Sequence, residues 1–146
     1  MKACRGFTHE EHTADVLIRA WGRNIEELFE NAAIGVYEVV TDTSKVAPSR
    51  RVEVEVEGMD LYNLLYRWIE EFIAYTDSEG LVFSKFSVCK IENRGDSWII
   101  RSSALGEVFD PERHEHRTIV KAMTYAQMEI KKVSEGCWEA TFVVDI

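Results

Sequence analysis

Strict alternation of apolar and polar residues predicts several β-strands along this chain. In residues 51–57 valine alternates with arginine or glutamate, which is typical of a strand with one buried and one solvated face. Residues 16–21 and 137–146 alternate in the same way. In the last segment Asp145 is expected on the face opposite to the core. The side chains expected to point into the core are Trp138, Ala140, Phe142 and Val144.

Two segments on either side of a turn predict a β-hairpin. Residues 81–92 and 98–104 alternate, and the residues between them are Asn, Arg, Gly and Asp, which favour a turn. Residues 118–132 fit both a helical face and strand alternation. We favour a strand with an irregular middle near Tyr125. A long polar loop is predicted at 106–117, and such loops in compact domains usually have a function.

Two segments with apolar residues three and four positions apart predict α-helices. Asn24 can cap the first helix, with Glu27 three residues later. Asp60 can cap the second helix, which is expected to end near Asp77. The apolar faces are Ile25, Leu28, Phe29, Ala32, Ala33, Val36 and Val40 in the first helix, and Leu61, Leu64, Leu65, Trp68, Ile69, Phe72 and Ile73 in the second.

The order of these elements indicates a single α+β domain over residues 1–146. A strand-helix-strand unit is followed by helix-strand-strand, which suggests a doubled strand-helix-strand motif. We expect two helices packed on a largely antiparallel β-sheet. The length allows a substantial core, and 46% hydrophobic with 29% charged residues is typical of a globular protein.

Charge and cysteine content narrow the classes of function. The 17 basic and 26 acidic residues give a net charge of −9, which opposes direct binding to a phosphate backbone. Any link to nucleic acid is therefore expected to run through a partner. Cys4, Cys89 and Cys137 are odd in number and widely spaced, which suits a reducing cytoplasm better than a disulfide framework or a zinc knuckle. No apolar run reaches membrane-spanning length, and residues 1–6 lack a signal-peptide core.

Carboxylates near both ends of the chain form the first candidate site. Asp15 opens an apolar strand, and Asp145 precedes Ile146, whose α-carboxylate is expected to add another negative charge. If the first and last strands pair, three negative charges meet. Such a cluster is stable only when a hard, oxygen-preferring divalent cation neutralises it. The alternative is two unrelated surface aspartates.

Histidine pairs are weaker candidates for a metal site. His9 and His12 lie three positions apart, whereas the zinc-protease helix motif requires four. His114 and His116 would place two imidazoles on one side of an extended segment, as a zinc or nickel pair would require, but solvated loop histidines are more common. The chain contains no nucleophile elbow, P-loop or dinucleotide fingerprint, which weakens the case for a stand-alone enzyme.

Four segments, taken in order, resemble the archease family, and the similarity spans the whole chain. They are His12-Thr13-Ala14-Asp15-Val16, the helical residues 26–33, Lys121-Ala122-Met123-Thr124-Tyr125 and Val144-Asp145-Ile146. Leu17 and Ala126 depart from the glycine and histidine that are usual in that family. Archeases are small protein cofactors of the RtcB-type RNA ligase, which joins tRNA halves after intron removal.

The resemblance implies that this chain is not itself a catalyst. It would promote guanylylation of the ligase, allow repeated turnover and widen nucleotide use, and it would meet RNA only through the ligase. The family's calcium ligands correspond to Asp15, Asp145 and Ile146, and its functional lysine corresponds to Lys121, which taken alone is a solvated lysine. Two alternatives stay open: a metal-dependent hydrolase that uses Asp15, Asp145 and the four histidines, and a passive, chaperone-like interaction module.

Overall fold

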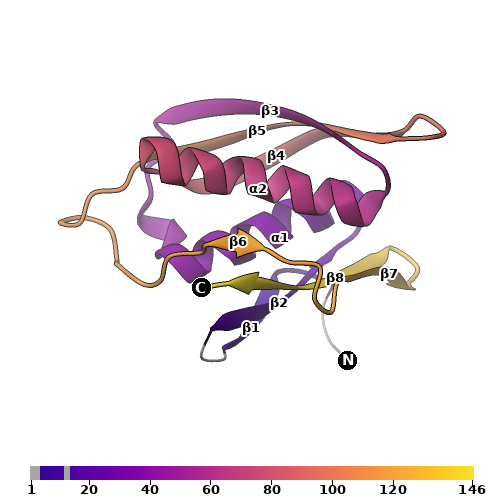
Figure 1. Cartoon of the computed structure of the whole chain (residues 1–146), viewed down its shortest axis with the longest axis horizontal. Helices are drawn as coiled ribbons and strands as arrows, with labels where there is room; N and C mark the ends of the chain where they lie inside the picture. Colours follow the sequence, from indigo (N-terminus) through magenta and orange to yellow (C-terminus); the bar gives the residue numbers. More distant parts are fainter. Residues whose placement is uncertain (1–3, 12–13) are drawn as a thin grey trace.

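The computed structural model of the chain describes residues 4–11 and 14–146. Within these ranges two antiparallel sheets enclose two α-helices, α1 (Ile25–Val40) and α2 (Leu61–Glu79) (Figure 1). The first sheet has the order β1-β2-β8-β6, with β7 also paired to β8, and the second has the order β3-β5-β4. The strands are β1 (Phe7–Glu11), β2 (Asp15–Gly22), β3 (Arg50–Gly58), β4 (Leu81–Asn93), β5 (Trp98–Val108), β6 (Ala122–Met123), β7 (Glu129–Ser134) and β8 (Cys137–Asp145).

The predicted α+β class is confirmed, with both helices packed on antiparallel sheet. Helix α1 lies between β4 and β2, and α2 contacts β3 and β5 on one side and β6 and β7 on the other. The two helical connections differ, because β2 and β3, which flank α1, lie in different sheets, whereas β3 and β4, which flank α2, lie in the same sheet. None of the helices in the described ranges is long and apolar enough to cross a membrane.

Both predicted helix caps form. The Asn24 side chain accepts a hydrogen bond from the Glu27 N–H at 2.8 Å, and the Asp60 side chain accepts one from the Asn63 N–H at 2.8 Å. Helix α2 ends at Gly80, whose φ of 71° lies in the left-handed region that suits glycine. The apolar faces are buried as expected, with Phe29, Trp68 and Phe72 among the largest buried side chains.

Strand β1 is the element that the sequence pattern did not predict. It has five residues, of which Phe7 alone is strongly apolar, and it pairs with β2 at the edge of the first sheet. Short edge strands lack the alternation that marks half-buried ones. The ambiguous segment 118–132 does form strands with an irregular middle, because β6 and the start of β7 flank a turn around Tyr125.

A disulfide corrects the interpretation of the cysteines. Cys4 and Cys137 are bonded, with their Cα atoms 5.7 Å apart, although they are separated by 133 positions in the sequence. The sheet order explains the contact, because β1 and β8 flank β2 and both begin near its Gly22 end. The preference for free thiols is therefore wrong for this pair, and Cys89 is a free, exposed cysteine. Sequence spacing alone could not pair them.

The long loop predicted at 106–117 begins later than expected, because β5 continues to Val108, and a buried carboxylate of β5 holds the loop to the fold. Glu107 accepts hydrogen bonds from the Ala47 N–H at 2.6 Å and from Arg113 at 2.6 Å. Chiefly because of Arg113, and then of the Ala47 N–H, the pKa of Glu107 falls to about 2. His114 Nδ1 accepts from the Asp110 N–H at 2.8 Å, so its Nε2 carries the proton and donates to Glu107 at 2.8 Å.

This arrangement removes His114 from the candidate metal ligands. Its side chain is buried and both ring nitrogens are occupied, so the expectation of a solvated loop histidine is wrong for it. His116 is exposed, and its ring lies near Phe109. Farther along the loop, Arg117 donates to the Glu38 carbonyl at 2.7 Å, which ties the segment to the end of α1. Contacts at Glu107 and Arg117 therefore fix the loop to the rest of the fold, and the loop leads to Lys121, the residue before β6.

Replacing Glu107 by glutamine tests this anchor through its dependence on pH. The pKa of Glu107 is lower in the folded chain, so its charge stabilises the fold above about pH 4.5 and stops doing so as the pH falls towards 2. We expect Glu107→Gln to lose about 2–4 kcal/mol of unfolding free energy at neutral pH. Urea unfolding at several pH values should show the two proteins converging near pH 2. Glu112→Gln, an exposed carboxylate in the same loop, is the control, and parallel curves for Glu107→Gln and wild type would contradict the anchor.

Removing the disulfide should lower stability without changing the fold. The bond closes a loop of 133 residues, and such a cross-link restricts the unfolded chain, so Cys137→Ser is expected to cost about 2–5 kcal/mol. Thermal unfolding with and without a reductant measures the effect on Tm. Cys89→Ser should leave Tm unchanged. Identical Tm values for the oxidised and reduced wild-type protein would argue against the bond.

Candidate functional site

The two predicted aspartates lie directly opposite each other. In the antiparallel pairing of β2 with β8, Asp15 is the partner of Asp145, and the next pair inward is Val16 with Val144. Both valines are completely buried, so the aspartates belong to the opposite face of the sheet. Asp15 is half-buried and Asp145 is exposed. Side chains in such positions have Cβ atoms about 5 Å apart, and like charges there destabilise a sheet.

The last residue continues this pairing. The Ile146 N–H donates to the Ala14 carbonyl at 3.1 Å, which extends the contact between the two strands beyond Asp145. The Ile146 side chain is partly buried against the core. The two carboxylates and Ile146 are therefore brought together at one end of the first sheet, as the sequence suggested.

Lys121 reaches the same place from the other side of β8. Its N–H donates to the Asp145 carbonyl at 2.8 Å, and the following residue, Ala122, is the strand partner of Asp145. Because β8 lies between β2 and β6, the positions of Asp15, Asp145 and Ala122 form a row across three strands. Lys121 is exposed next to this row. Strand β8 thus joins the predicted site residues Asp15, Asp145 and Lys121.

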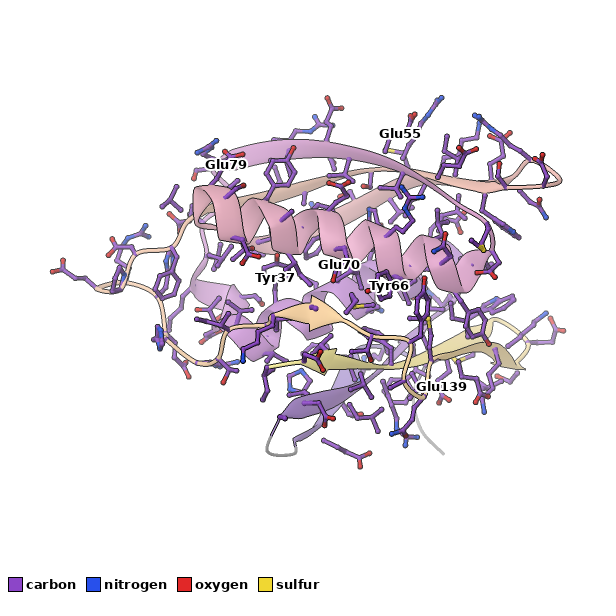
Figure 2. All side chains as sticks on the ribbon, viewed as in Figure 1. Tyr37, Glu55, Tyr66, Glu70, Glu79 and Glu139 are labelled. Carbon is purple, nitrogen blue, oxygen red and sulfur yellow. A yellow bond between two sulfur atoms is a disulfide. The ribbon has the colours of Figure 1, made fainter. Side chains whose placement is uncertain are left out.

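Glu70 is a residue of this region that the sequence did not suggest. It lies on α2, half-buried, and its carboxylate accepts a hydrogen bond from the Met123 N–H at 2.7 Å. Figure 2 shows Glu70 and Tyr66 on the side of α2 that faces β6. Met123 is paired with Val144, the neighbour of Asp145. A third carboxylate therefore stands behind the strand end that presents Asp145.

Glu70 belongs to a row of α2 residues spaced four apart. Tyr62 accepts a hydrogen bond from the Ile130 N–H at 3.1 Å, and Tyr66 stacks on Tyr125, with ring centroids 4.3 Å apart. Residues at this spacing share one helix face. The row fastens residues 123–130 along α2, so the segment after Lys121 is held by side chains as well as by β8. In the sequence, the four-residue spacing of Tyr62, Tyr66 and Glu70 beside the apolar stripe was the pattern that could have indicated this row.

The electrostatic environment of the stacked tyrosines is negative. Burial raises the pKa of Tyr66 first, and the neighbouring Glu70, Tyr125 and Asp145 raise it further. The phenol is therefore neutral at physiological pH and can act as a hydrogen-bond donor. The Asp15–Asp145 pair and Glu70 concentrate negative charge at this end of the molecule.

Among the residues that the structure describes, the donor atoms identified at the strand end are carboxylate oxygens. Among the described residues, no three His, Cys, Asp or Glu side chains come together as a metal site, and at the strand end two such side chains, Asp15 and Asp145, lie opposite each other. His9 bonds to the Gly35 carbonyl at 2.9 Å. His12 lies outside the described residues. An oxygen-only set favours calcium or magnesium over zinc.

Comparison with known proteins gives a consistent result. The model of the Archease protein family matches residues 7–146. A protein archease of Aeropyrum pernix is 70% identical over 143 residues, which are 98% of this chain and 99% of that protein. The protein archease of Pyrococcus furiosus is 44% identical over 142 residues, 97% of this chain and 99% of that protein.

Two solved structures have the same fold. Protein 1598 of Methanobacterium thermoautotrophicum has a TM-score of 0.82 and 40% identity, covering 97% of this chain and 99% of that one. An archease of Thermotoga maritima, described as a possible chaperone, has a TM-score of 0.59 and 19% identity over 94% of each chain. Family model, sequence relatives and fold agree from β1 to the last residue, and this chain belongs to the archease family.

Proposed function

We propose that this chain is a non-catalytic activator of an RtcB-type RNA ligase, which promotes ligase guanylylation and repeated turnover and widens nucleotide use. Membership of the archease family supports the choice of partner. The observation that carries the proposal is the direct opposition of Asp15 and Asp145 beside Lys121 at the end of β8. Two carboxylates in register and a nearby exposed amine form a compact polar site.

The carboxylate pair is proposed to hold one divalent cation, with calcium as the first candidate. Opposed aspartates repel each other, and a hard cation with oxygen ligands turns that repulsion into attraction. Asp15, Asp145 and the terminal carboxylate of Ile146 would be its ligands. The cation would supply positive charge near the transferred phosphate. The chain's own contribution is to keep these carboxylates in register through the β2–β8 ladder.

Lys121 is proposed to contact the partner or its nucleotide. Its backbone is fixed by the bond to Asp145, whereas its side chain is exposed and takes part in none of the ion pairs found among the described residues. An ammonium group on a fixed backbone can approach a phosphate or a carboxylate without reordering the loop.

The net charge of −9 supports docking on a basic, RNA-facing surface of the ligase. An activator that acts once per catalytic cycle must also leave, so the contact is expected to be transient. RNA would then be displaced or met only through the ligase. If activation is not observed, the alternative that remains is a passive, chaperone-like interaction module.

Calcium binding should depend on Asp145. Removing one charge from the opposed pair leaves fewer anionic ligands, so Asp145→Asn is expected to weaken calcium affinity about tenfold or more, which is about 1.4 kcal/mol. Isothermal titration measures Kd. Asp96→Asn, at an exposed position in the β4–β5 turn, is the matched control and should bind as wild type does. Unchanged affinity in Asp145→Asn would remove the site.

The use of the α-carboxylate can be tested separately with tags. Residues appended after Ile146 convert that carboxylate into an amide, so a C-terminal tag should weaken calcium binding and an N-terminal tag should not. Equal affinity for both tagged proteins would exclude the terminus as a ligand and leave the two aspartates in place.

Ligase turnover is the test of the proposed function. With excess RNA, GTP and metal, the ligase alone should stop after about one product per molecule, and substoichiometric amounts of this chain should restore many cycles. Lys121→Ala is expected to fold normally, within about 0.5 kcal/mol of wild type, yet to activate poorly. Lys45→Ala, which removes another exposed lysine, should activate fully. A plateau at one product per ligase with the wild-type chain would refute activation.

A further inference from the structure

An exposed aromatic and apolar patch lies around the N-terminal end of α2. Tyr125 is 51% exposed, Met59 72% and Tyr62 36%. Asn63 joins them, because its Nδ2 donates to the Tyr125 hydroxyl at 2.8 Å and its Oδ1 accepts from the Met59 N–H at 3.1 Å. We call Tyr66 and Tyr125, with Met59 and Tyr62 beside them, the tyrosine platform.

The ring of Tyr125 is fixed despite its exposure. One face stacks on Tyr66 at an interplanar angle of 11°, and the hydroxyl is held by Asn63. The turn behind it closes through the Met128 N–H, which donates to the Tyr125 carbonyl at 3.1 Å. Thr124 anchors the turn to β8, since its hydroxyl donates to the Val143 carbonyl at 2.8 Å. A ligand that binds the open face of Tyr125 would not need to order this side chain, so the entropic cost of binding would be lower.

The backbone of this turn is strained. Gln127 has a φ of 55°, and it is the one residue other than glycine with a positive φ in the described ranges. A side chain in that region costs about 1 kcal/mol or more. Strain of this kind persists where the surroundings over-determine the conformation. Gln127 lies in the turn that the Met128 N–H closes onto the Tyr125 carbonyl, two positions after the exposed tyrosine.

Charge decides which planar ligand suits the platform. Carboxylates of Glu70 and Asp145 lie close enough to raise the pKa of Tyr66, and the chain carries a net charge of −9. With Asp60, which caps α2 next to Met59, these carboxylates are three, and they outnumber the basic side chains nearest in sequence, Arg67 on α2 and Lys121. A phosphate-bearing nucleotide is repelled here. A guanidinium group is flat, permanently positive and stacks on aromatic faces, whereas an ammonium group does not match a ring in this way.

We propose that the tyrosine platform receives an arginine side chain of the partner protein, stacked on the open face of Tyr125. The inference rests on the proposed function in one respect, since it takes the ligase's basic surface as the source of the arginine. It adds to the strand-end site a second contact, on the far side of the segment 121–125. Met59 and Tyr62 would exclude water around the stacked pair, as the rim of a binding hot spot does.

Variants of Tyr125 test the platform against the ligase. Tyr125→Ala should weaken binding to the ligase at least tenfold by surface-based affinity measurement, because truncating a central aromatic anchor usually costs that much or more. Tyr125→Phe keeps the ring, so its affinity should stay within about threefold of wild type. Val133→Ala removes another exposed apolar side chain, 45% exposed on β7, and should have no effect. Equal affinities for Tyr125→Ala and wild type would overturn the proposal.

Short peptides identify the chemistry without the ligase. A hexa-arginine peptide should bind the wild-type chain several-fold more tightly than hexa-lysine, and Tyr125→Ala should abolish that preference. Chemical-shift changes in the wild-type chain on adding hexa-arginine should centre on Tyr66 and Tyr125. This measurement does not depend on the folding of any variant. Equal binding of both peptides would overturn the proposal, as would oligouridine binding that depends on Tyr125, because that result would make the platform a base-stacking surface.

The outcomes separate this inference from the proposed function. If the wild-type chain activates the ligase and Tyr125→Ala activates and binds equally well, the platform fails and the activator proposal stands. If the wild-type chain does not bind the ligase at all, the activator proposal fails. The comparison of hexa-arginine with hexa-lysine then tests by itself whether the platform binds arginine.

Discussion

The antiparallel register between β2 and β8 is the constraint on which the rest of the structure depends. Ile18, Phe142 and Val144 are completely buried, and a slip of β8 by one residue would turn Phe142 and Val144 away from the core. Burying side chains of this size is worth about 2 kcal/mol each, so the register is strongly specified. The same register places Asp15 opposite Asp145. The core therefore places two carboxylates opposite each other, and the proposed cation would offset their repulsion.

Helix α2 connects this strand end to the centre of the molecule. On one side Trp68 donates to Ser102 at 2.8 Å, and Ser102 in turn donates to the Val54 carbonyl at 2.9 Å, which locks the helix to the second sheet. On the other side Tyr66 and Glu70 hold the segment that follows Lys121. A polar site on a strand end and a turn is thus supported by a buried helix, which gives it the rigidity that a binding surface requires.

The sequence predicted those elements whose burial is periodic and failed where contacts depend on distant pairing. Strand β3 and both helices follow from alternation and apolar stripes, and the carboxylate cluster follows from the pairing of the first and last strands. The Cys4–Cys137 bond and the burial of His114 do not. Predicting either feature requires knowing which segments meet in the folded chain. A polar segment is also expected to be exposed unless a partner such as Glu107 compensates for its burial.

Glu70 illustrates the same limit at the site itself. On a helical wheel it lies at the border of the apolar stripe, where a glutamate is usually solvated. Its role appears only when Met123 of β6 presents a backbone N–H to it. That N–H lies next to the β6–β8 pairing that holds Lys121, so a single carboxylate satisfies a main-chain donor and adds to the negative field around Asp145 and the stacked tyrosines. Because the negative field and the fixed backbone arise from the same contacts, the strand end and the tyrosine platform are both suited to a basic partner.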